Sequence, residues 1–291
     1  MKRLLFAVLL LASSMSHAAD EFPVVWSITD GLQAPESAYF DAESGFLFLS
    51  QIGDGGGMGK DGDGWISLLT TDGKFVENKW VTGLNAPKGV RSHKGTLWVS
   101  DIDRIVAIDI KQGKIAREVK IDGAKFLNDL ACGPDGAVYV ADMLASRIYK
   151  HHNGRTTVFA EGDQIESPNG LLVDGKRLIL AAWGKEINDD FTSNVPGRLL
   201  ALDLKTGRKR TVITKMPTGN LDGVESDGNG GWLVTDWIAG KVFHITGRGK
   251  TRTIMSFPKG AADHAYLVDK NLLILPEMLE NKLTAFDLSK L

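Results

Sequence analysis

The feature that most constrains the fold is a phrase that recurs six times after residue 30. In each copy, a turn and a polar residue precede a short strand-like run, a second turn and an apolar run. The copies begin APESAYF, APKGVRS, FLNDLAC, SPNGLLV, NLDGVES and ADHAYLV. They follow one another at intervals of about 40 or 50 residues, which is the length of one propeller blade.

Each repeat carries enough strand-like runs for one blade. Third strands are predicted at RIVAIDI, RIYKH, RLLALDL, KVFHI and KLTAFDL, and fourth strands at KIAREVKI, TTVFAE, RKRTVIT and KTRTIMSF. The runs are short, rich in β-branched or aromatic residues and bounded by Gly, Asp or Asn. No stretch of the mature chain shows a sustained helical period. The sequence therefore predicts an all-β fold, a six-bladed β-propeller of four-stranded blades.

The ring is expected to close through the N-terminal segment. The sixth repeat reaches Leu291 after its third strand, so its blade lacks an outer strand. A further strand-like run, EFPVVWSIT at residues 21–29, precedes the first repeat. Pairing of this run onto the last blade would supply the fourth strand and cover an open sheet edge.

The start of the chain has the order of a secretory signal peptide. Lys2 and Arg3 precede a short apolar run, and small residues follow it up to Ala18. That run is too short to cross a bilayer, and no later stretch reaches the ~18 apolar residues of a membrane span. We expect a signal peptide at 1–18, a single propeller domain at 19–291, and export to the periplasm or the extracellular space. A buried N-terminal helix is the alternative.

Composition excludes several classes of protein. The single cysteine, Cys132, rules out an intrachain disulfide framework and any multi-cysteine metal site. It lies in an apolar run and is predicted to be a small core residue. The 34 Lys and Arg residues nearly balance the 36 Asp and Glu residues, so no basic footprint for nucleic acid exists.

Two repeats are longer than the others, and both have their extra residues between the second and third strands. The insertions are QIGDGGGMGKDGDG at 51–64 and GKEINDDFTSNVPG at 184–197. The first and fourth repeats are opposite each other in a ring of six. Since these connections share a face with the starts of the innermost strands, we expect them to flank a pocket at the mouth of the channel.

Six residues occupy the same place at the start of the innermost strands: Glu36, Lys88, Asn128, Asn169, Asp222 and His264. We call them the anchors. Glu36, Asn128, Asn169 and Asp222 offer only oxygen ligands, which suit a hard divalent cation. Ca²⁺ is the first expectation, with Mg²⁺, Mn²⁺ or Zn²⁺ as alternatives. One such residue alone would more simply order its own turn, but four at one repeat position favour a metal site.

The phrases APES, FLND, SPNG and NLDG around these anchors resemble the senescence-marker-protein/gluconolactonase/luciferin-regenerating-enzyme family of six-bladed propellers. The resemblance extends over nearly the whole mature chain. It implies a metal at the top of the channel, held by Glu36, Asn169 and Asp222. It also implies that Asn128 contacts the substrate or the metal, and that the activity opens lactones or hydrolyses related esters.

The other two anchors are Lys88 and His264. Lys88 fills the position at which the related paraoxonases have a histidine proposed as the base, so that mechanism does not carry over unchanged. Its ammonium can hold an anionic substrate or stabilise an oxyanion, or it can extend into solvent. His264 can act as a general base or have a passive, hydrogen-bonded role.

These assignments predict two groups of residues besides the metal ligands. The catalytic residues are predicted to be Asp222, His264 and Lys88. The predicted substrate contacts are Asn128, Asp129, Lys88, Asp263 and Trp183. Asp129 can equally cap its own turn, and Trp183 with Trp237 can either wall an apolar pocket or pack in the core.

Two functions remain open at this point. The first is an exported, metal-dependent hydrolase of a small lactone or ester, with no nucleic-acid partner. The second is a non-catalytic periplasmic propeller that binds a small ligand or a partner protein, because a propeller can be a scaffold as readily as an enzyme. No G-x-S-x-G or H-E-x-x-H motif supports a serine hydrolase or a zinc protease.

Overall fold

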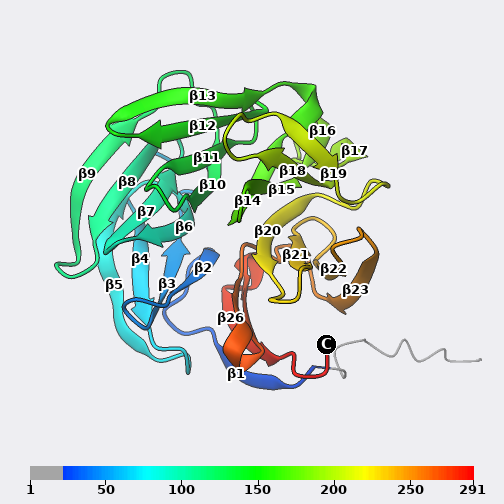
Figure 1. Cartoon of the computed structure of the whole chain (residues 1–291). Coiled ribbons are helices and arrows are strands. Elements are labelled where there is room, and N and C mark those ends of the chain that lie inside the picture. Colours follow the sequence, from blue (N-terminus) through cyan, green and yellow to red (C-terminus); the bar gives the residue numbers. More distant parts are fainter. Residues whose placement is uncertain (1–21) are drawn as a thin grey trace, which may run out of the picture.

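The computed structural model describes residues 22–291, so the predicted signal peptide lies outside the described residues. Six four-stranded antiparallel sheets stand side by side around a central channel (Figure 1). The predicted all-β, six-bladed propeller is therefore confirmed. None of the described helices is long and apolar enough to cross a membrane.

Blades one to three each contain four consecutive strands, numbered from the channel outward. Blade one contains β2 (Pro35–Asp41), β3 (Phe46–Gln51), β4 (Gly64–Leu69) and β5 (Phe75–Leu84). Blade two contains β6 (Pro87–His93), β7 (Thr96–Asp101), β8 (Arg104–Asp109) and β9 (Lys114–Lys120). Blade three contains β10 (Leu127–Cys132), β11 (Val138–Asp142), β12 (Arg147–His152) and β13 (Arg155–Glu161).

Blades four to six follow the same plan with two additions, a hairpin and three short 3₁₀ turns. Blade four contains β14 (Pro168–Asp174), β15 (Arg177–Ala182), β18 (Leu199–Asp203) and β19 (Lys209–Val212), with the hairpin β16 (Gly184–Ile187) and β17 (Ser193–Pro196) inserted. Blade five contains β20 (Leu221–Ser226), β21 (Trp232–Asp236), β22 (Lys241–Ile245) and β23 (Thr251–Ser256). Blade six contains β24 (Ala265–Leu267), β25 (Leu272–Glu277) and β26 (Lys282–Asp287). The 3₁₀ turns are η2 (Asp163–Ile165), η3 (Val268–Lys270) and η4 (Met278–Glu280).

The N-terminal strand completes the last blade. β1 (Val24–Ile28) pairs antiparallel with β26, from Val24 opposite Phe286 to Ile28 opposite Leu283. The sheet order β1-β26-β25-β24 confirms the expected closure, in which the two ends of the chain share one blade. β1 covers the outer edge of β26 and gives the last blade the same four strands as the others.

The hydrophobic core lies between neighbouring blades, because both faces of each sheet are covered. All five residues of β11, for example, are buried, whereas every residue of β9 at the rim is exposed or half-buried. Cys132 is half-buried at the end of β10, where burial raises the pKa of its thiol to about 12. The thiol is therefore protonated at neutral pH and unreactive, as a packing residue should be.

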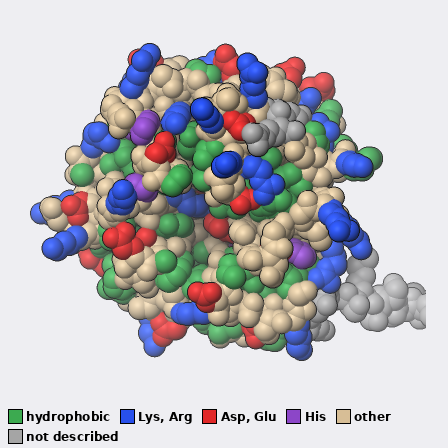
Figure 2. Space-filling model, in the orientation of Figure 1, with side chains coloured by type: hydrophobic (Ala, Val, Ile, Leu, Met, Phe, Trp, Pro, Cys, Tyr) green, Lys and Arg blue, Asp and Glu red, His purple; other side chains and the backbone are tan. Residues whose placement is uncertain are grey.

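Glycine after an anchor allows the innermost strands to converge. A Cβ atom on Gly170 would overlap the carbonyl oxygen of Asp222 in the next blade. A Cβ atom on Gly223 would lie 2.5 Å from Oδ1 of Asp263 in the blade after that. The strands can therefore approach closely enough to bring their side chains to one channel. Figure 2 shows one face of the ring, hollowed at its centre, where acidic and basic groups are visible.

Closure predicts a steep dependence of stability on the N-terminal segment. Deletion of residues 19–30 removes β1 and should lower the melting temperature of the whole ring. Phe22, which is buried between blades five and six, gives a sharper test. Phe22→Ala should lower the free energy of unfolding by about 3–5 kcal/mol. Val24→Ala, at a side chain that is 57% exposed, is the control and should change it by less than about 0.5 kcal/mol. Equal effects of the two substitutions in denaturant unfolding would contradict the closure.

Candidate active site at the mouth of the channel

A β-bulge places the anchor in five of the six innermost strands. Pro35 pairs with Gln51 and Ser37 with Ser50, so Glu36 between them has no partner residue. The same register shift occurs in β6, β10, β14 and β20. A bulge bends the strand and re-aims the extra side chain, which is why the anchors turn toward the channel instead of lying against a neighbouring blade.

Side chains of the second strands hold these bulges in place. The backbone N–H of Ser37 donates to Ser50 Oγ at 2.9 Å, and that of Gly223 donates to Thr235 Oγ1 at 2.8 Å. The aspartate that ends a second strand secures the turn before an anchor. Asp142, for example, accepts the N–H groups of residues 125 and 126, three and two residues before Asn128. The anchors are thus fixed by the blade itself and not by flexible loops.

The anchors converge on a cavity of about 230 Å³. Five of the six line it, all except the histidine: Glu36, Lys88, Asn128, Asn169 and Asp222. Both long insertions also contribute, Gly57 and Met58 from the first and Asp190 and Phe191 from the second. The expectation that these two loops flank the mouth agrees with this lining.

We call the five anchors that line the cavity its floor. Two oxygens of this floor have no hydrogen-bond partner within the described part of the chain. They are Glu36 Oε2 and Asn169 Oδ1, both buried. The amide nitrogen of Asn169 donates to Asp222 Oδ1 at 2.8 Å. Buried oxygens without partners are costly, so this floor is arranged to accept something from outside the chain.

The carboxylates of the floor are destabilised in their charged form. Burial, followed by the charge of Asp222, raises the pKa of Glu36 well above its usual value. Burial, followed by the charges of Asp263 and Asp129, does the same to the pKa of Asp222. A divalent cation would reverse both effects and satisfy the orphaned oxygens. The residues present therefore fit a hard cation.

The donor set also bears on which cation fits. Among residues 22–291 no group of three or more His, Cys, Asp or Glu side chains is arranged to hold a metal ion. Any cation at the floor would therefore need the amide oxygens of asparagine besides the two carboxylates. Such a set suits Ca²⁺ or Mg²⁺ better than Zn²⁺, which prefers nitrogen and sulfur ligands.

Lys88 is the one positively charged anchor in the lining of the same cavity. Its side chain is buried, and Nζ donates to the carbonyl oxygens of Gly57 at 2.8 Å and Ala86 at 3.0 Å. The nitrogen also lies 4.6 Å from the centroid of the Phe126 ring. Burial lowers the pKa of the amine to about 8, while the charge of Glu36 opposes this shift. Lys88 therefore does not extend into solvent. Its hydrogen bond to Gly57 connects the first insertion to the floor of the cavity.

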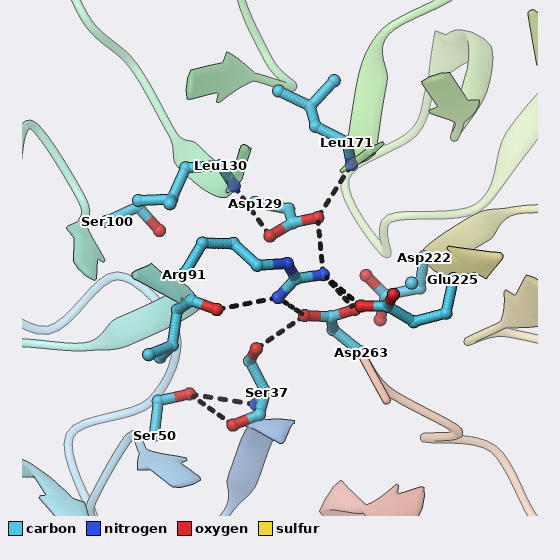
Figure 3. A network of polar contacts seen from close by, with 12 residues as sticks. Ser37, Ser50, Arg91, Ser100, Asp129, Leu130, Leu171, Asp222, Glu225 and Asp263 are labelled. Atoms are coloured by element: carbon cyan, nitrogen blue, oxygen red, sulfur yellow. Dashed lines mark hydrogen bonds and ion pairs between the residues drawn. The ribbon is translucent and has the colours of Figure 1, made fainter. Parts of the chain in front are cut away.

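The structure does not bring three of the predicted site residues to the cavity. Asp129 and Asp263, predicted as substrate contacts, instead flank Arg91 within the channel (Figure 3). His264, predicted as a catalytic base, is fully buried, and both of its ring nitrogens lack a partner among the described residues. Burial lowers its pKa to about 4, so the ring is neutral at pH 7. Asp129 lies at the bulge of β10, directly after the anchor Asn128, and this bulge turns the two side chains in different directions. His264 is itself an anchor, but its strand β24 has no bulge to turn the side chain toward the cavity.

Arg91 is the centre of this buried ionic network, and the sequence analysis missed it. Its guanidinium donates to Asp263 at 3.0 and 3.4 Å, and lies 3.1 Å from Glu225 Oε1 and 3.7 Å from Asp129 Oδ2. Ser37 Oγ donates to the same Asp263 carboxylate at 2.5 Å. One side chain of blade two thereby links blades one, three, five and six (Figure 3). A usable signal existed, because Arg91 and Glu225 each lie three residues after an anchor.

The pattern described as the SMP-30/Gluconolactonase/LRE-like region matches residues 73–274, more than half of the chain. The chain therefore belongs to the SMP-30/gluconolactonase/LRE-like family, as its anchor phrases suggest.

Solved structures with this fold include proteins named for different activities. A gluconolactonase from Xanthomonas campestris is 16% identical, with a TM-score of 0.66 over 91% of this chain and 89% of its own. A catalytically inactive virginiamycin B lyase from Staphylococcus aureus, with quinupristin, is also 16% identical, with a TM-score of 0.63 over 92% of this chain and 100% of its own. At these identities the likeness shows the fold alone. No match is found among curated proteins.

Removal of the Arg91 charge should destabilise the ring. Arg91→Met leaves Asp129, Glu225 and Asp263 buried without their cation, and should lower the free energy of unfolding by about 3–5 kcal/mol. Arg147→Met removes a surface pair with Glu161 and is the control, with an expected loss of at most about 1 kcal/mol. Denaturant unfolding of the two variants measures the difference. Equal losses would show that Arg91 is not a structural link.

Glu225 should make stability depend on pH. Burial raises the pKa of Glu225 to about 7, although Arg91 opposes the shift. The folded chain then keeps this proton up to about pH 7, whereas the unfolded chain releases it near its ordinary value of 4.5. The contribution is therefore fully present below about pH 4.5 and is lost as the pH rises through 7, at roughly 1.4 kcal/mol per pH unit. Melting temperatures from pH 4.5 to 8 should fall less steeply in Glu225→Gln than in the parent. Glu43→Gln, at an exposed carboxylate, should leave the slope unchanged.

Proposed function

We propose that this chain is an exported, divalent-metal-dependent hydrolase of a small lactone or ester. The observation that carries the proposal is the floor of the cavity. There, Glu36, Asn169 and Asp222 meet from three different blades, and two of their buried oxygens have no partner among the described residues. A structural turn residue would use its own oxygen locally, and these two do not.

Glu36, Asn169 and Asp222 would hold the cation, and Asn128 lies beside them on the cavity wall. Ca²⁺ is the cation that this donor set favours. When bound, such a cation supplies Lewis-acid polarisation of a carbonyl oxygen. The hydrogen bond from Asn169 Nδ2 to Asp222 Oδ1 fixes the relative orientation of two of the ligands.

We assign Asp222 as the general base that accepts a proton from the attacking water. Its carboxylate lines the same cavity as the other proposed ligands, and a carboxylate so placed can act as a general base. His264 lies outside the cavity lining and therefore has no assigned part in this step. Lys88 uses two of its three N–H donors on backbone carbonyls, and the third remains for the oxygen of a substrate or an oxyanion.

Export is supported by the basic, apolar and small-residue order of residues 1–18. The mature chain would then begin at residue 19, which N-terminal sequencing of the exported protein tests. Location in the periplasm or outside the cell follows from the same segment.

The mature protein should hydrolyse members of a panel of lactones and aryl esters in the presence of Ca²⁺. A chelator should abolish the turnover and added Ca²⁺ should restore it. Asp222→Ala should lower kcat/KM by roughly 100-fold or more, because it removes both a cation ligand and the proton acceptor. Steady-state kinetics on the panel measures both effects.

The matched control is Asp269→Ala, at an exposed aspartate in η3. It should leave kcat/KM unchanged. Full activity of Asp222→Ala would sink the proposal. Bound metal without turnover on any substrate would favour the non-catalytic propeller, with a small ligand or a partner protein in this cavity.

A further inference from the structure

The wall of the cavity comes from a second position of the repeat, distinct from the anchors. It is the residue that directly follows the second strand of each blade: Ile52, Ile102, Met143, Trp183, Trp237 and Met278. All six are apolar, and all except Ile102 line the cavity. We call these five residues the apolar collar. Both the polar floor and the apolar collar therefore come from repeated positions, which lie at the same end of the inner hairpin of a blade.

Further apolar side chains extend the collar. Phe126 and Phe191 line the same cavity with ring centroids 5.7 Å apart, and Met58 adds a third side chain. The Trp183 and Trp237 rings lie 6.2 Å apart. Aromatic rings and methionines present broad, adaptable apolar surface.

The wall offers a ligand few hydrogen-bonding groups. The indole N–H of Trp183 donates to the carbonyl oxygen of Phe191 at 2.8 Å, so the protein already uses it. Above the floor, the charged side chains in the lining are Asp190 and Lys259, and the ammonium of Lys259 lies 5.0 Å from the centroid of the Trp237 ring. A ligand with hydroxyl groups along its body would lose hydrogen bonds to water without replacing them.

We infer that the substrate is amphipathic, with its ester or lactone group at the oxygen floor and an alkyl or aryl substituent against the apolar collar. A polyhydroxylated sugar lactone fits this wall poorly. The inference rests on the proposed function for the reacting group, and adds the chemical class of the remainder of the molecule.

A series of γ-lactones tests the inference, from γ-butyrolactone through γ-hexalactone and γ-octalactone to γ-decalactone, beside D-glucono-δ-lactone. With the mature, Ca²⁺-loaded protein, kcat/KM should rise about fourfold per methylene until the collar is covered. The sugar lactone should react roughly 100-fold more slowly than γ-octalactone. A flat series, or a sugar lactone equal to the octalactone, would overturn the inference.

Met278→Gln places a polar side chain of similar size in the collar, at a half-buried position. It should flatten the dependence of kcat/KM on chain length. Met216→Gln is the matched control, because Met216 is 74% exposed and does not line the cavity. It should leave the series as in the parent. An unchanged series in both variants would show that the collar does not contact the substituent.

Binding without turnover separates this inference from the proposed function. Calorimetry with γ-lactams of the same chain lengths, which resist hydrolysis, should show affinity rising with chain length and a negative heat-capacity change. If no lactone is hydrolysed but the lactams bind in this way, the proposed function fails and the amphipathic ligand class stands. If a sugar lactone is hydrolysed with metal dependence and chain length has no effect on either measurement, the inference fails and the proposed function stands.

Discussion

The structure depends on the neutralisation of acidic groups that the ring forces together. Five buried or nearly buried carboxylates occupy the channel and its mouth: Glu36, Asp129, Asp222, Glu225 and Asp263. The described cations among them are Arg91 and Lys88. Arg91 pairs with three of the carboxylates. Burial first, and then the charges of neighbouring carboxylates, raise the pKa values of Glu36 and Asp222. Buried charge of this kind is stable only when it is paired or protonated, or when it binds a cation.

Two positions of the repeat supply most of the lining of the cavity, one its polar groups and the other its apolar groups. The anchor begins the innermost strand and supplies oxygen or nitrogen to the floor, whereas the residue after the second strand supplies the apolar wall. Antiparallel pairing places the two positions at the same end of a hairpin, so blades one, three, four and five each add one of each to the lining. Blade two adds only its anchor, Lys88, and blade six only Met278. Proteins named for different activities, a gluconolactonase and a virginiamycin B lyase, share this fold, so the fold alone does not specify a reaction.

The periodic part of the structure could be predicted from the sequence. The recurrence of the phrase around Glu36, Asn169 and Asp222 was enough to place these residues at one mouth, and the run before residue 30 was enough to predict closure. The repeat did not show which way the residues next to the anchors point. Asp129 follows Asn128, yet Asn128 lines the cavity while Asp129 accepts the N–H groups of Leu130 and Leu171 and faces Arg91.

The sequence alone therefore determined the number of blades, their order, the closing strand and the equivalent positions, because these follow from repetition and from the alternation of strands and turns. Only the tertiary structure decided which side chains face the cavity, which charges pair, and where the walls are apolar. The direction of a side chain at a bulge depends on the register with the second strand and on the approach of the next blade. No local pattern encodes that approach, since it exists only once the ring has closed.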